Sequence, residues 1–67
     1  MKWRILPPRQ SMIYNTIKLC ERINLYDLDL VMNYAFSPNL TQTINDVRAL
    51  RRYGLIKKVN YCFEFVK

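Results

Sequence analysis

The stretch that most constrains the fold is residues 39–58, NLTQTINDVRALRRYGLIKK. Apolar side chains recur in it at helical spacing and would form one buried stripe: Leu40, Ile44, Val47 and Leu50. Gly54, the only glycine of the chain, supplies the left-handed residue that commonly ends a helix. Leu55 and Ile56 then begin a strand. The pattern predicts a helix over residues 39–53 that leads directly into a strand.

The other faces of this helix are polar or basic, and they carry Thr41, Gln42, Thr43, Asn45, Arg48, Arg51 and Arg52. Residues 39–60 contain five basic residues and one acid, so this segment alone has a net charge of +4. We interpret the acid, Asp46, as a partner of an adjacent arginine. A polar, basic helix followed by a basic hairpin has a shape and charge that fit a DNA major groove.

The size and charge of the chain restrict the classes of protein and of partner that are possible. Its 67 residues allow one domain, and an apolar fraction of 51% is too high for an intrinsically disordered chain. The formal net charge of +6 indicates a polyanionic partner, with nucleic acid first and an anionic membrane second. The alternative interpretation is that the charge serves solubility alone.

The two cysteines and the lack of histidine argue against metal chemistry. Cys20 and Cys62 cannot supply the usual four zinc ligands, so no metal or other cofactor is expected. We interpret them as small buried hydrophobes in a reducing compartment, with a single disulfide as the alternative. No apolar run approaches the roughly 18 residues of a membrane span. The N-terminus does not resemble a signal peptide, so a soluble cytoplasmic protein without a membrane partner is expected.

Residues 1–9 are predicted to form a basic N-terminal arm, and residues 10–67 a folded domain. Pro7 and Pro8 exclude helix from the arm because proline lacks a backbone donor and restricts its predecessor. The arm contains three basic and three apolar residues: Lys2, Arg4, Arg9, Trp3, Ile5 and Leu6. Two interpretations stay open. Either the apolar side chains pack on the body or on a neighbouring chain, or the arm enters a minor groove.

The domain is predicted to begin with a helix over residues 10–23. Its apolar stripe comprises Met12, Ile13, Ile17, Leu19, Cys20 and Ile23. Lys18 and Arg22 form a basic pair one turn apart, which we interpret as a solvated face. Residues 23–26 suit a short strand or a loop.

Asp27 is predicted to cap a second helix that ends near residue 35, with Leu28, Val31, Met32 and Ala35 facing the core. Residues 36–39 form a turn. The third helix begins either with Ser37 as its cap and Pro38 in the first turn, or with Asn39 as its cap. Tyr34 and Tyr53 are interpreted as core or interface aromatics.

Two strands are predicted after the third helix, over residues 55–58 and 61–66, with Val59 and Asn60 in the turn. The alternating aromatic residues of the second strand would close the core: Tyr61, Phe63 and Phe65. The predicted fold class is mainly α with a small β-hairpin (α+β), with three helices and a two- or three-stranded antiparallel sheet.

This order of elements resembles the winged helix-turn-helix DNA-binding superfamily. The local match covers DVRAL at residues 46–50 and GLI at residues 54–56, where an apolar-x-x-leucine step precedes a Gly-Leu-Ile that opens the wing. DeoR and MarR regulators are examples of this pattern. The sequence departs from them in its very short wing, and it has neither the extra dimerisation helix of MarR regulators nor a ligand-binding domain. No small-molecule effector is therefore expected.

The resemblance implies that the third helix enters the major groove and that the wing contacts phosphates. The candidate DNA-binding residues are Asn39, Thr41, Gln42, Thr43, Asn45, Arg48, Arg52, Lys57, Lys58 and Asn60. Amide side chains can pair with adenine, and a threonine methyl can touch thymine. Arg52, Lys57 and Lys58 are expected at phosphates.

The expected function is therefore that of a small duplex-DNA-binding protein, a transcription regulator of phage, viral or plasmid type. Homodimerisation through the N-terminal arm or the first helix is expected, because one half-site gives modest affinity. The alternative is a winged-helix protein–protein interaction module within a larger complex. Enzymatic activity is not expected, because the chain lacks histidine and shows no carboxylate pair or glycine-rich phosphate loop.

Overall fold

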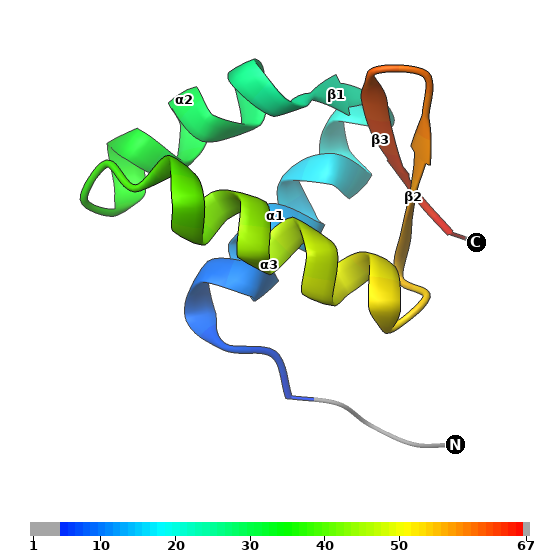
Figure 1. Ribbon diagram of the computed structural model, residues 1–67, viewed down its shortest axis with the longest axis horizontal. Helices are drawn as coiled ribbons and strands as arrows, with labels where there is room; N and C mark the ends of the chain where they lie inside the picture. Colours follow the sequence, from blue (N-terminus) through cyan, green and yellow to red (C-terminus); the bar gives the residue numbers. More distant parts are fainter. Residues whose placement is uncertain (1–4, 67) are drawn as a thin grey trace.

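The computed structural model describes residues 5–66, in which three helices lie against a small antiparallel sheet (Figure 1). The elements follow in the order α1 (Pro8–Cys20), β1 (Ile23–Asn24), α2 (Leu25–Ala35), α3 (Leu40–Arg52), β2 (Ile56–Val59) and β3 (Cys62–Phe65). The strand order in the sheet is β1-β3-β2. The arrangement is consistent with a winged-helix-like topology, with α2 and α3 in the positions of the helix-turn-helix and β2 and β3 in that of the wing. The predicted α+β class is confirmed.

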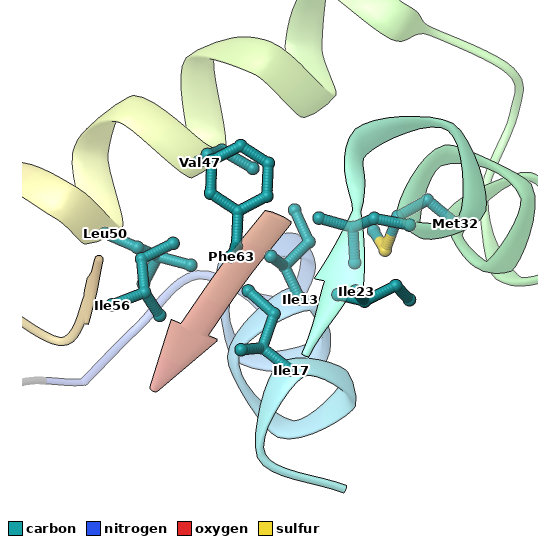
Figure 2. Close-up of a cluster of buried hydrophobic side chains, with 9 residues drawn as sticks. Ile13, Ile17, Ile23, Met32, Val47, Leu50, Ile56 and Phe63 are labelled. Atoms are coloured by element: carbon teal, nitrogen blue, oxygen red, sulfur yellow. The ribbon is translucent and has the colours of Figure 1, made fainter. Parts of the chain in front are cut away.

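The hydrophobic core lies where the three helices meet the sheet, and every element contributes to it (Figure 2). Its buried residues are Ile13, Ile17, Ile23, Leu28, Met32, Val47, Leu50, Ile56 and Phe63. Strand β1 reaches this core by pairing with β3, with Ile23 opposite Phe63. Within residues 5–66, no helix is long and apolar enough to cross a membrane.

Helix α1 begins earlier than predicted. Pro8 and Arg9 belong to its first turn instead of the arm, because proline at the first helical position loses no hydrogen bond and already has the helical φ. The helix also ends earlier, at Cys20, and Glu21 follows with a positive φ of 65°. Of the predicted arm, Leu6 packs against the core and Ile5 is exposed. Lys2, Trp3 and Arg4 lie outside the described residues.

Helix α2 is capped by Asn24 and not by Asp27. The Asn24 side chain accepts a hydrogen bond from the Asp27 backbone N–H at 2.8 Å, so the helix starts at Leu25 and Asp27 lies in its first turn. Residues 23–26 are thus a two-residue strand followed immediately by the helix. Leu28 and Met32 are buried as expected, whereas Val31 is half-buried and Ala35, the last helical residue, is exposed.

Each end of helix α3 is fixed by a local hydrogen-bonded motif. Asn39 caps its N-terminus by accepting a hydrogen bond from the Gln42 backbone N–H at 3.0 Å, which decides between the two predicted caps. At the other end, the backbone N–H of Gly54 donates to the carbonyl of Arg51, and that of Leu55 donates to the carbonyl of Leu50. This is a Schellman motif, and Gly54 has the predicted left-handed conformation with φ of 79°.

The buried stripe of α3 is rotated from the predicted one. Val47 and Leu50 are buried, but Leu40 is 45% exposed and Ile44 only half-buried. Thr43 and Asp46 are buried in their place. Polar residues can occupy this position because α1 and α2 supply their hydrogen-bond partners, described below.

Several side chains that were expected in the core are exposed: Leu19, Cys20 and Tyr61. Each lies at the end of a helix or at the tip of the hairpin, beyond the reach of the core. The hairpin turn consists of Asn60 and Tyr61, because Val59 still pairs with Cys62. Asn60 has φ of 58°, a conformation that asparagine tolerates. Both cysteines are free, and Cys62 is half-buried.

Candidate nucleic-acid interface

One face of α3 points away from the core and consists of polar and basic side chains. Thr41, Asn45, Arg48 and Arg52 are all exposed, and steps of four, three and four residues place them along one line of a helix. We call these four residues the outer stripe of α3. All four were predicted to contact DNA.

A polar network beneath α3 fixes which face turns outward. Asp46 is almost fully buried, and its carboxylate accepts hydrogen bonds from Arg9 Nε at 3.2 Å and from Gln42 Nε2 at 3.0 Å. Gln10 Nε2 lies 3.4 Å from the same carboxylate. A buried carboxylate without such donors would be strongly unfavourable, so the network holds this face of α3 against α1.

Thr43 joins the same network to α2. Its hydroxyl oxygen accepts a hydrogen bond from Arg9 Nη2 at 3.1 Å. The hydroxyl also lies 3.3 Å from Asp29 Oδ1 and 3.2 Å from the Asn39 carbonyl oxygen, either of which can accept its proton. The Arg9 guanidinium also lies over the ring of Phe36, 5.1 Å from its centroid. Arg9 thereby connects α1 to α3 and to the turn between α2 and α3.

The basic side chains divide into two groups. Arg9 is bound to Asp46, Arg22 forms an ion pair with Glu64 at 2.7 Å, and Lys18 lies over the Tyr14 ring. The cations of α3 and β2 form no ion pair or side-chain hydrogen bond with any part of the chain from residue 5 to residue 66: Arg48, Arg51, Arg52, Lys57 and Lys58. The only acid of residues 39–60 is buried and paired with Arg9, and Glu64, the acid opposite Lys57, is paired with Arg22, so this segment presents a positive surface.

The two wing lysines point to opposite faces of the sheet. In the β2–β3 register, Lys57 lies opposite Glu64, whereas Lys58 lies opposite the core residue Phe63. Successive residues of a strand alternate between faces, so the two side chains cannot make equivalent contacts. Lys58 also lines a hollow of about 280 Å³, together with Asn24, Leu25, Tyr26, Tyr61 and Phe63.

Not every predicted site residue is available for a partner. Thr43 was expected to contact DNA, and this is wrong for the conformation described, because the residue is fully buried. Asn39 and Gln42 are exposed, but the Asn39 oxygen caps α3 and the Gln42 amide donates to Asp46. Asn60 is exposed at the hairpin turn.

Sequence reasoning missed the role of Arg9. Asp46 was interpreted as a partner of an adjacent arginine. It does bond an arginine, but this is Arg9 of α1, 37 residues away, so the predicted adjacent partner was wrong. The one available signal was that Asp46 is the single acid among residues 39–60 and directly precedes Val47 of the buried stripe, where a carboxylate requires a nearby cation. Among residues 5–66, no group of three histidine, cysteine or acidic side chains could hold a metal ion.

No family model matches the chain, and neither a curated protein nor a solved structure matches it at a significant level. The function is therefore inferred from the fold and from the geometry of α3 and of the β2–β3 hairpin.

Proposed function

We propose that this protein binds duplex DNA by placing the outer stripe of α3 in the major groove, and that it acts in this way as a transcription regulator. The observation that supports the proposal most is the outer stripe itself. Thr41 and Asn45 lie nearer the N-terminus of α3, the end from which a helix-turn-helix reads base edges. Arg48 and Arg52 follow on the same line, where guanidinium groups reach guanine or phosphate.

The free cations support the same conclusion through their number and position. Each phosphate neutralised by a basic side chain releases counterions, so the affinity falls with salt in proportion to the number of contacts. Five free cations on α3 and β2 predict a slope of log K against log salt of roughly −3 to −5. Arg9 and Arg22 are used within the fold and are not expected to contribute.

The proposal is tested by fluorescence anisotropy on labelled duplex DNA, at low and near-physiological salt. The Arg48→Ala/Arg52→Ala variant should lose most of its affinity, and its salt slope should fall by about 2. The matched control is Lys18→Ala/Arg22→Ala, which removes the same charge from outside α3 and β2. The control should retain most of the affinity, because surface interactions such as the Arg22–Glu64 pair contribute little to stability.

An equal loss of affinity in both variants would show that only net charge matters and would contradict a site on α3. Absence of binding by the wild-type protein at low salt would overturn the proposal as a whole. In that case the alternative, a module that binds another protein, would take its place.

A further inference from the structure

The outward face of α2 carries apolar and aromatic side chains instead of polar ones. Tyr26, Leu30 and Tyr34 are 79%, 57% and 92% exposed, and they recur every four residues along one line of the helix. Tyr61, which is 85% exposed, lies near Tyr26 across the hollow described above. We call these four residues the aromatic face. We propose that it is the interface of a symmetric homodimer, in which α2 packs antiparallel against α2 of a second copy.

The first argument for a second copy is the symmetry of the face. A two-fold interface requires a surface that is complementary to itself. Tyr26 and Tyr34 lie four residues before and after Leu30, so a two-fold axis at Leu30 brings Leu30 against its counterpart. The same axis places Tyr34 of each chain level with Tyr26 of the other.

The second argument is that each chain presents both a projecting side chain and a recess to receive it. Tyr34 is the most exposed aromatic residue of α2, and the hollow of about 280 Å³ opens beside Tyr26. The two-fold arrangement brings each Tyr34 next to the hollow of the other copy. Aromatic side chains that fill such recesses dominate the binding energy of interfaces.

The distribution of charge also favours α2 as the interface between two copies. Two copies with a net charge of +6 repel each other, and they approach most easily through a surface without basic residues. Helix α2 is such a surface, because its only charged residues are Asp27 and Asp29. Among the described residues, the cations without a partner in the fold lie on α3 and β2, so pairing through α2 keeps the outer stripes of the two copies out of the interface.

The exposed area of the aromatic face is a large part of what a stable interface buries. Given the size of aromatic side chains, the aromatic face exposes about 600 Å² in each copy. A stable interface buries about 800 Å² per partner, so this face supplies most of the required area. This dimer differs from the one expected from the sequence, which used the N-terminal arm or the first helix. It does not depend on DNA binding.

The test is sedimentation equilibrium of the full chain without DNA, over a range of concentrations. The wild-type protein should show a monomer–dimer equilibrium. Leu30→Glu and Tyr34→Ala should each weaken dimerisation by roughly thirtyfold, as expected for central interface residues. Leu19→Ala, which removes an 86% exposed apolar side chain from α1, should leave the dimer unchanged. Far-UV circular dichroism verifies that each variant is folded.

A crosslinking experiment tests the antiparallel arrangement directly. In a Cys20→Ser/Cys62→Ser background, Leu30→Cys should form a disulfide-linked dimer on mild oxidation, because the two-fold axis brings the two side chains together. Leu19→Cys in the same background should crosslink far more slowly. A strictly monomeric wild-type protein would overturn the proposal. So would a dimer that Leu30→Glu does not weaken, or equal crosslinking at the two positions.

Discussion

Arg9 connects three parts of the fold through one side chain. Its guanidinium contacts Asp46, Thr43 and the Phe36 ring, so a single side chain links α1, α3 and the turn before α3. We expect Arg9→Ala to lower the free energy of unfolding by about 2–3 kcal/mol, because it leaves the buried Asp46 carboxylate without its cation. Urea denaturation measures this change.

Arg51→Ala is the matched control for Arg9→Ala, because Arg51 is exposed and makes no ion pair with any described residue. It should change the free energy of unfolding by less than about 0.5 kcal/mol. Equal effects of the two substitutions would show that the Arg9 network does not stabilise α3.

Two threonines of α3 are expected to have different roles, Thr43 in the stability of the fold and Thr41 in DNA binding. Thr43 is fully buried and bonded to Arg9, so Thr43→Ala should cost about 2 kcal/mol of stability through a lost hydrogen bond and a cavity. Thr41 is exposed on the outer stripe, so Thr41→Ala should leave stability unchanged and weaken DNA binding. Thermal unfolding and anisotropy measured on the same samples test the pair. A reversed pattern would mean that α3 presents the opposite face.

At the scale of elements, the features that could be predicted from the sequence are those with local signals. The end of α3 followed from Gly54, and the two wing strands followed from the alternation after it. The start of α2 was missed because Asn24 and Asp27 are both good caps, and only the strand pairing of Ile23 and Asn24 with β3 decides between them.

The rotation of α3 could not be predicted from the sequence, because it depends on contacts between distant residues. An amphipathic pattern favours Leu40 and Ile44 as buried positions. Arg9 makes it possible to bury Thr43 and Asp46 instead, and no spacing in the sequence connects these residues. The site residues of α3 were predicted because their side chains are polar. This criterion succeeded for the four residues of the outer stripe and failed for Thr43, which is polar but buried.

The positions of the two wing lysines lead to a prediction about DNA binding. Lys57 and Lys58 lie on opposite faces of the sheet, so we expect Lys57→Ala and Lys58→Ala to weaken DNA binding unequally. The variant with the larger loss should weaken binding to all duplexes similarly and reduce the salt slope by about 1. Equal losses in the two variants would contradict the assigned register, or would show that the wing does not touch DNA.

At the scale of the whole molecule, charge is distributed unevenly among the elements. Among residues 5–66, the basic side chains without an ion pair or ring contact lie on α3 and β2, Arg9 and Arg22 are paired with acids, Lys18 lies over the Tyr14 ring, and the only charged residues of α2 are acids. Such a distribution orients a protein as it approaches a polyanion, with α3 and β2 leading. The same distribution leaves α2 available to a second copy.

The central claim is that the outer stripe of α3 is the DNA-binding surface, and the most direct measurement is a titration of isotope-labelled protein with duplex DNA, followed by amide NMR shifts. We predict that the largest shifts cluster at Thr41, Asn45, Arg48 and Arg52. Smaller shifts should occur in β2, and little change at Leu30. Shifts that cluster on α2, with α3 unaffected, would contradict the account.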